Sequence, residues 1–416
     1  MKYDPFREAL EIREQLASEK RKLAFFFGGG TSMSAGLPGI KELTMEVAKE
    51  LKDNFKGQFG KIKKELPGDA NVEDVLDRIR IYRELIAEST TAEFAGIKGK
   101  EAAKKLDATI CQLIAKSVSV PTFDRMKAHR IFAQWLRILY CNRNWPVEIF
   151  TTNYDVLFES SMEEIGVPFF DGFVGSVEPF FVPESIEADE EDKNCASSYP
   201  PRMWTRLWKI HGSINWHIVK QKFYDSERIS RFTGVTDKEG GELMIFPSRE
   251  KYAQSRKLPF IALQDRLRKF VLTGESLVII VGYSFSDQHI NDILLQGLRT
   301  NPRMTIMVFL FETPNDNILS FGKENRNLIL YGPDKACIGG IVSDWVIPTR
   351  QKKDDESWPF WDEKTNKFVL GNFTKFAAFL EEYIGFRQYT SQEKIIQTGS
   401  ATEMLKQGQK EEKLEK

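Results

Sequence analysis

Residues 25–36 read FFFGGGTSMSAG: three phenylalanines, three glycines, a run of mostly small hydroxyl-bearing residues, and one more glycine. The phenylalanines complete a short apolar run that begins near Lys22, which is the form of a β-strand buried on both faces. A helix is expected to follow from Gly36. A run of residues with small side chains or none raises the question of what the backbone approaches closely at this point.

A buried strand, a glycine-rich turn and a helix start form a geometry that binds a dinucleotide phosphate. Glycine lets the backbone come close to a pyrophosphate, and the N–H groups of a helix N-terminus face the anion. The stretch is not GxGxxG, because Ser32 and Met33 occupy places that this spacing needs, and no GK[ST] follows to make a P-loop. A tight strand-to-helix turn without a ligand is the alternative.

The rest of the chain predicts strands that alternate with helices, which indicates an α/β fold with a parallel sheet in three layers. The predicted strands, some quoted with the turn that follows, lie within 22–30, 147–155, 167–170, 206–213, 241–248, 276–284, 305–312 and 328–331. The predicted helices cover 5–20, 71–88, 101–118, 124–142, 157–165, 288–299 and 372–384. Residues 54–70 are polar and lysine-rich and are expected to form a surface connection.

The order of these segments predicts two parts. The main α/β domain covers 1–345 and contains a helical insertion at about 40–142. A C-terminal extension over 346–416 carries the helix at 372–384 and a polar tail. Residues 184–199 have the composition of a solvated acidic loop.

Charge and composition exclude several classes of protein. The 416 residues carry 59 basic and 60 acidic side chains, so no global field attracts nucleic acid or an anionic membrane. Residues 1–19 are charged throughout, unlike a signal peptide, and apolar runs such as 277–281 are far too short for a bilayer span. We therefore expect a soluble, cytoplasmic protein without direct membrane or nucleic-acid binding.

The four cysteines and four histidines form no metal-binding pattern. No two cysteines make a CxxC pair, and the histidines make no HExxH motif. The sequence thus predicts neither a disulfide framework nor a protein-bound metal ion.

Three further turns lie where predicted strands end. TTNYD places Asn153 and Asp155 just past an apolar strand, KIHGS ends a strand at His211, and GYSFSDQH follows another strand from Gly282. Ligand sites of open α/β sheets lie outside the carboxyl ends of the strands, so these turns are expected to converge with the glycine stretch.

Each of these side chains also has an ordinary structural role. An asparagine such as Asn153 often bonds its own backbone in a turn, and His211 fits a hydrogen-bonded histidine at a strand end. Ser286 or Asp287 fits the cap of the helix that starts at 288. Four such turns at successive strand ends favour one shared site over four separate structural roles.

These motifs resemble the sirtuin family. GGGTSMSAGLP (28–38) resembles the sirtuin loop GAGxSxxSGIP, TTNYD resembles TQNxD, IHGS resembles the HG motif, and VGYS (281–284) resembles the late GTS loop. All four occur in the family's order over about two thirds of the chain. The resemblance implies that the 1–345 domain is a Rossmann-like NAD-binding catalytic domain that cleaves the bond between nicotinamide and ribose.

The chain departs from sirtuin deacylases at two motifs. Gly39, Ile40 and Lys41 stand where deacylases carry DFR, and only Cys337 follows His211, so the two CxxC pairs of a structural zinc module are absent. This pattern is similar to bacterial sirtuin-like NAD-cleaving effectors of anti-phage defence, which deplete NAD after infection (abortive infection). The resemblance therefore implies a hydrolase with NAD as its substrate and no zinc.

The chemistry assigns roles to the catalytic residues. Nicotinamide leaves NAD as a neutral group, so the reaction needs support for an oxocarbenium-like ribose and a placed nucleophile. Asn153 can hold a water or a ribose hydroxyl, and His211 can act as a general base near neutral pH. By resemblance, Asp155 accepts from the nicotinamide carboxamide.

The remaining predicted contacts belong to the nucleotide. By resemblance, the loop from Gly29 to Gly36 contacts the pyrophosphate and the late loop lines the adenosine ribose; ligand contact and helix capping are equal alternatives for Ser34. The predicted nucleotide-binding residues are Gly29, Gly30, Thr31, Ser32, Gly36, Asp155, Gly282 and Ser284.

Three functions fit these residues. The first is an NAD glycohydrolase that yields nicotinamide and ADP-ribose or a cyclic product, the second a deacylase or ADP-ribosyltransferase, and the third a non-catalytic NAD or ADP-ribose sensor. The missing zinc cysteines and DFR disfavour the second, and the presence of Asn153 and His211 disfavours the third. Because a constitutive NADase would kill its host, we also expect regulation by homo-oligomerisation or by a partner such as a DNA-translocating ATPase or another phage sensor.

Overall fold

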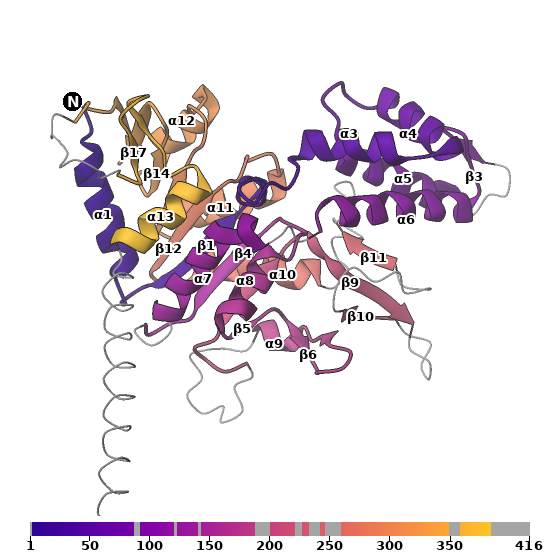
Figure 1. The fold of residues 1–416 in the computed structure, drawn as a ribbon, viewed down its shortest axis with the longest axis horizontal. Helices are drawn as coiled ribbons and strands as arrows, with labels where there is room; N and C mark the ends of the chain where they lie inside the picture. The colour runs from indigo at the N-terminus through magenta and orange to yellow at the C-terminus, as the bar shows by residue number, and fades with distance from the viewer. Residues whose placement is uncertain are drawn as a thin grey trace, which may run out of the picture.

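The computed structural model describes residues 2–86, 92–119, 123–139, 143–187, 200–220, 227–232, 242–245, 259–348 and 358–383. Its centre is a nine-stranded sheet in the order β16-β15-β14-β13-β12-β1-β4-β8-β5 (Figure 1). The neighbours from β14 to β5 pair in parallel, and β15 and β16 add an antiparallel edge. The strands are β1 (Lys22–Phe27), β4 (Val147–Thr151), β5 (Phe169–Phe170), β8 (Thr205–Lys209), β12 (Ser276–Val281), β13 (Met304–Phe309), β14 (Leu328–Tyr331), β15 (Lys335–Ile338) and β16 (Ile341–Asp344). The predicted α/β fold with a mostly parallel central sheet is confirmed.

Strand β1 lies in the middle of this sheet, between β12 and β4. Phe25 pairs in register with Ile279 on one side and Ile149 on the other, and all three side chains are fully buried. Phe25 and Phe27 enter the core on one face, and Phe26 enters the core on the opposite face. Full burial of one such side chain stabilises the fold by roughly 1.5–3 kcal/mol, so the phenylalanines anchor the glycine turn that follows.

Helices cover both faces of the sheet and make the three predicted layers. One face is covered by α1 (Pro5–Ala17), α7 (Lys127–Leu139), α8 (Leu157–Ile165) and α13 (Phe373–Tyr383). The other face is covered by α10 (Phe260–Leu272), α11 (Gln288–Thr300) and α12 (Asp316–Glu324), of which α10 and α12 were not predicted. Helix α13 comes from the predicted C-terminal extension, and its Phe373 ring lies 5.4 Å from that of Phe27.

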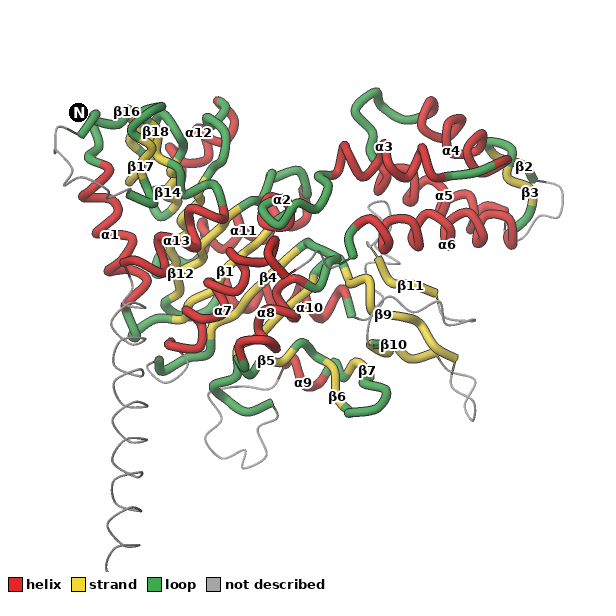
Figure 2. The backbone as a smooth tube through the Cα atoms, viewed as in Figure 1, coloured by secondary structure: helices red, strands yellow, loops and turns green. Residues whose placement is uncertain are grey.

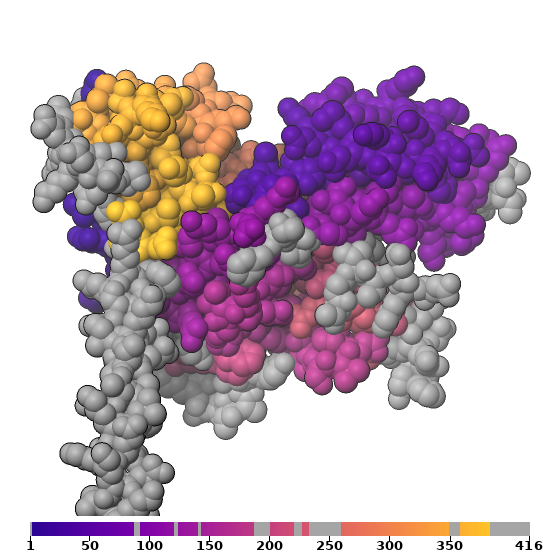
Figure 3. All heavy atoms as spheres, viewed as in Figure 1, coloured from indigo at the N-terminus to yellow at the C-terminus, as the bar shows by residue number. Residues whose placement is uncertain are grey.

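Between β1 and β4 the chain forms a helical lobe with a core of its own. The lobe contains α3 (Ile40–Glu50), α4 (Asp53–Glu65), α5 (Val72–Ile86) and α6 (Lys100–Ser117), with a small hairpin of β2 (Glu93–Phe94) and β3 (Ile97–Lys98). The space-filling view shows it as an indigo and purple mass beside the rest of the chain (Figure 3). The following helix, α7, instead packs against α8 and α13 over the sheet.

Two predictions about this part of the chain were wrong. Residues 54–70 are not a surface connection, because α4 covers most of them and buries Phe59 and Ile62 at helical spacing among the lysines. The helix predicted from Gly36 exists, but its predicted start was wrong. The short helix α2 (Gly29–Met33) lies within the glycine stretch, and α3 begins only at Ile40, after Gly39 as its N-cap.

A second, five-stranded sheet lies beside the first, in the order β11-β9-β10-β7-β6 (Figure 2). Its strands are β6 (Phe173–Val174), β7 (Phe180–Phe181), β9 (Gly212–Lys220), β10 (Glu227–Arg231) and β11 (Glu242–Ile245). The strand predicted within 241–248 therefore exists but pairs with β9, outside the parallel sheet. Of the predicted acidic loop, α9 (Glu184–Glu187) is described and 188–199 lie outside the described residues. No helix among the described residues has the length and apolar character needed to cross a bilayer.

Candidate functional site at the carboxyl edge of the sheet

Two of the three glycines after β1 are required by packing against the end of β12. A Cβ on Gly28 would lie 2.5 Å from the carbonyl oxygen of Gly282, and one on Gly30 would lie 2.7 Å from the Gly282 Cα. Gly282 itself has a φ of +69°, which favours glycine. By contrast, a Cβ on Gly29 would meet nothing within 4 Å. Gly29 is thus the one glycine of the three whose missing side chain no neighbouring atom explains.

The backbone of this turn is largely bonded within the protein. The Gly30 N–H donates to Gly282 O at 2.9 Å, the Thr31 N–H to Gly28 O at 3.0 Å, and the Gly28 N–H to Val281 O at 3.2 Å. Ser34 Oγ donates to Thr31 O at 2.6 Å, which is a local bond at the end of α2. The predicted phosphate contacts of this turn therefore depend on Gly29. The other bonded groups of the turn would have to exchange a hydrogen bond within the protein for one to the phosphate.

Asn153 lies just past β4 and is buried against the glycine turn. Its Nδ2 donates to Gly28 O at 3.1 Å, Thr31 Oγ1 at 2.9 Å and Ser32 Oγ at 2.8 Å. The side chain therefore does not bond its own backbone, as the structural alternative required. It crosses between two strand ends and ties them together.

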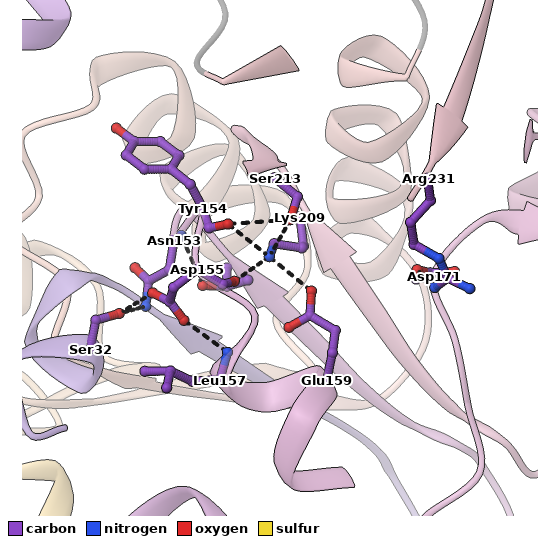
Figure 4. Close-up of polar contacts among 11 residues, drawn as sticks. Ser32, Asn153, Tyr154, Asp155, Leu157, Glu159, Asp171, Lys209, Ser213 and Arg231 are labelled. Carbon is purple, nitrogen blue, oxygen red and sulfur yellow. Dashed lines mark hydrogen bonds and ion pairs between the residues drawn. The ribbon is translucent and has the colours of Figure 1, made fainter. Parts of the chain in front are cut away.

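Asp155 lies two residues further on and is also buried. Its Oδ2 accepts from Ser32 Oγ at 2.5 Å, and its Oδ1 accepts from the Leu157 N–H at 3.1 Å, at the start of α8 (Figure 4). Ser32, Asn153 and Asp155 thus form one hydrogen-bonded chain from the glycine turn to the β4–α8 turn.

His211 lies in the turn between β8 and β9 and is 6 % exposed. Its Nε2 lies 2.9 Å from Asp287 Oδ2. The other oxygen of Asp287 accepts from the backbone N–H groups of His289 and Ile290 and so caps α11. Asp287 therefore caps α11, the role that its position in the sequence fitted, and it also pairs with His211.

The pKa of Asp287 is lowered to about 2. Burial acts in the opposite direction and would raise it, but the hydrogen bond and charge of His211, with the N–H groups of Ile290 and His289, outweigh burial. The Asp287 carboxylate therefore stays ionised through the neutral pH range and accepts a hydrogen bond from His211 Nε2. A histidine held by a carboxylate has the arrangement of an oriented general base.

We expect Asp287→Asn to lower the free energy of unfolding by about 2 kcal/mol at pH 7, since a pKa depressed from 3.8 to about 2 corresponds to roughly that linkage. A depressed pKa stabilises the fold above the unfolded value and loses this effect as the pH falls through the folded value. The gap between wild type and variant should therefore close between about pH 4 and pH 2. Urea unfolding across this range measures it. Asparagine also caps helices well, so the variant should keep the cap of α11. A difference in unfolding free energy that persists at low pH would therefore contradict the His211 pairing as its cause.

These groups face a cleft of about 770 Å³. Of the predicted site residues, the cleft is lined by Gly29, Gly30, Ser32, Asn153, Asp155, His211, Gly282 and Ser284. Thr31 is fully buried beneath the turn, and Gly36 lies after α2 with Arg125 as its neighbour; neither lines the cleft. The carboxyl ends of β1, β4, β8 and β12 are thus brought together as the sequence predicted.

The opposite wall of the cleft comes from the helical lobe, which the sequence analysis did not assign to a site. The lobe's lining residues include Leu43, Leu66, Asp69, Ala70, Asn71, Glu73, Asp74 and Val118. With Asp155 and Asp287, this wall makes the lining acidic, and no lysine or arginine is among the described residues that line it. Such a lining favours a ligand with a cationic group. No sequence motif predicts this wall, because its position depends on how the helical lobe packs against the rest of the chain.

The described residues contain no group of three or more histidine, cysteine, aspartate or glutamate side chains placed to hold a metal ion. The two described cysteines, Cys111 and Cys337, are both buried, and neither forms a disulfide bond within the described part of the chain.

Comparison with known proteins finds a family model that matches part of the chain. Residues 147–329 match the model of the SIR2-like domain, a span that contains Asn153, His211 and Gly282 but not the glycine stretch. Two solved structures are similar: a triple mutant of Sir2 homologues with 2′-O-acetyl ADP ribose (14 % identity, TM-score 0.32, 73 % of this chain and 85 % of that chain) and a single mutant of a Sir2 homologue with ADP ribose (15 %, 0.34, 73 % and 86 %). These scores are too low to transfer a site. No curated protein sequence matches the chain significantly.

Proposed function

We propose that the chain is an NAD glycohydrolase, which cleaves the nicotinamide–ribose bond with water and forms nicotinamide and ADP-ribose. The observation that carries the proposal is the meeting of Asn153, Asp155 and His211 in one cleft beside Gly29. The SIR2-like match over two of these turns supports it.

The reaction requires mainly that the substrate and a water molecule are positioned correctly and that the developing positive charge is stabilised. As the C–N bond breaks, its electron pair moves into the pyridinium ring, and nicotinamide leaves neutral without a general acid. Water attacks the ribose carbon, and Nδ1 of His211 takes the proton, because Nε2 already donates its own proton to Asp287, which stabilises the resulting imidazolium. Asn153 positions the water or a ribose hydroxyl, and Asp155 accepts from the carboxamide of the leaving group.

The acidic lining fits this substrate at one end. The pyridinium ring and the developing oxocarbenium ion are cationic, so carboxylates nearby favour binding and the transition state. The pyrophosphate is anionic and has no lysine or arginine to meet among the described lining residues. We place it at Gly29, where the backbone is open to the cleft.

The glycines give a matched pair of variants. Gly30→Ala should lower the free energy of unfolding by about 1–3 kcal/mol, because its Cβ would meet the backbone of Gly282 at 2.7 Å. Gly29→Ala meets nothing within 4 Å and should leave stability unchanged or raise it by up to about 1 kcal/mol. It should nevertheless weaken NAD binding about tenfold or more, since the methyl group stands where the phosphate approaches. Urea unfolding and calorimetric titration with NAD measure both effects. NAD binding by Gly29→Ala as tight as wild type would make the glycine stretch a packing feature alone.

One experiment separates the three candidate functions. Purified protein is incubated with NAD, with and without an acyl-lysine peptide, and nicotinamide and ADP-ribose are quantified by chromatography. The proposal predicts equal nicotinamide release in both samples. Release only with the peptide would indicate a deacylase, and calorimetric NAD binding without release under every activation condition tried would indicate a sensor.

We further propose that this activity depletes NAD in anti-phage defence and is held inactive until a trigger arrives. The support is the resemblance to sirtuin-like effectors. Homo-oligomerisation, or a partner such as a DNA-translocating ATPase or another phage sensor, would supply the control. Cells that express the chain should lose NAD after phage infection, and a fully active monomer in solution would contradict regulation by assembly.

A further inference from the structure

Lys209 is a buried cation directly beneath the candidate site. It is the last residue of β8, two positions before His211, and its side chain is only 2 % exposed. An ammonium group taken out of water is costly unless it is paired and hydrogen-bonded. Lys209 Nζ lies 2.8 Å from Glu159 Oε1 and 2.8 Å from Ser213 Oγ. Burial raises the pKa of Glu159, and the charge and hydrogen bond of Lys209 oppose that shift.

The other two partners of this ammonium group are backbone atoms of the β4–α8 turn. Nζ donates to Tyr154 O at 3.3 Å and also to Asp155 O. Tyr154 O accepts from Ser213 Oγ at 3.2 Å and from the Ile214 N–H at 3.0 Å as well. Figure 4 shows Lys209 between Glu159 and Ser213, with Tyr154 and Asp155 beside its ammonium group. The side chain thus joins the turn that carries Asn153 and Asp155 to the turn that carries His211.

A buried ion pair alone is weak evidence for stability, because an apolar pair of similar size often stabilises a fold as well. The backbone bonds are different, since no apolar side chain can donate to the two carbonyls. We propose that Lys209 is a positioning residue, whose ammonium group holds the Tyr154 and Asp155 carbonyls and thereby fixes Asn153 and Asp155 opposite His211. This inference rests on the proposed function.

Three variants test it. Glu159→Gln keeps the bonds of Lys209 to the turn, so kcat for nicotinamide release should stay within about threefold of wild type. Lys209→Met leaves Glu159 buried without its cation, so its thermal midpoint should fall by several degrees and kcat by about 10- to 100-fold. The double variant Lys209→Met/Glu159→Gln removes both charges and should regain most of the thermal midpoint but not kcat, with KM changed less than kcat.

Recovery of both the thermal midpoint and kcat in the double variant would overturn the inference and leave Lys209 as half of a structural ion pair. Hydrogen exchange gives a readout that does not depend on turnover. In the double variant, amides of residues 153–157 should exchange at least about tenfold faster, while β12 stays protected. Unchanged exchange in this turn would overturn the inference even if NAD is cleaved. A wild-type chain that neither binds nor cleaves NAD would instead refute the proposed function.

Discussion

Replacing His211 with alanine is expected to lower the rate of nicotinamide release from NAD by about 10²- to 10⁴-fold, the range that general-base catalysis supplies. The loss should appear mainly in kcat, because the proposed mechanism has His211 act on the attacking water rather than on the bound nucleotide. His211→Ala also removes the pairing with Asp287, so the free energy of unfolding should fall by up to about 2 kcal/mol, and turnover is compared at a temperature at which both proteins are folded. Steady-state kinetics with NAD, at matched protein concentration, measures it.

His289 provides the matched control for this variant. It is exposed on the first turn of α11, and its backbone N–H, which alanine keeps, bonds Asp287. His289→Ala should therefore retain wild-type turnover. Turnover by His211→Ala within about threefold of wild type would remove His211 from the chemistry and leave its bond to Asp287 as a structural contact.

Replacing Asn153 with alanine is expected to have two effects. Nicotinamide release should fall by about 100-fold or more, because the water or ribose hydroxyl loses its positioning group. The free energy of unfolding should also fall by about 1–3 kcal/mol, because buried hydroxyls of Thr31 and Ser32 lose the donor that Asn153 supplies. Kinetics and urea unfolding on the same preparation separate the two effects.

Asn301 is the matched control for Asn153. It is equally buried, and its Nδ2 donates to Val271 O at 3.1 Å and to Gly274 O at 2.9 Å, away from the residues that line the cleft. Asn301→Ala should cost a similar free energy of unfolding and leave turnover unchanged. Equal loss of turnover in both variants would mean that activity follows stability and not the amide of Asn153.

The central sheet was predictable because its strands carry a strong local signal. Runs such as 22–27 and 276–281 are almost wholly apolar, as strands buried on both faces must be. Once these strands are parallel, the turns after them must meet at one edge, and the cleft follows. The second sheet was not predicted as a unit, although its strand β11 was, because its strands are short or carry polar residues, as in β10, and lack a long apolar run.

The candidate site residues were easier to predict than the residues that they contact. Asp287 and His211 stand 76 residues apart, so no local pattern joins them, although both follow strand ends. Lys209 was quoted within KIHGS but given no role, because only the fold shows that its side chain reaches back to Tyr154 and Asp155. The glycines show the reverse case. The run of glycines in the sequence suggested a ligand. Close contact with Gly282 explains why Gly28 and Gly30 have no side chain, and only Gly29 remains without such a packing reason.

The central claim is that this cleft cleaves NAD with water as the only other reactant. The most direct measurement incubates the purified chain with NAD in heavy-oxygen water and records nicotinamide release and the mass of the ADP-ribose product. The proposed function predicts equimolar nicotinamide and ADP-ribose carrying one heavy oxygen atom, both lost in His211→Ala. NAD that binds in the cleft and remains intact under every activation condition tried, with and without an acyl-lysine peptide, would contradict it.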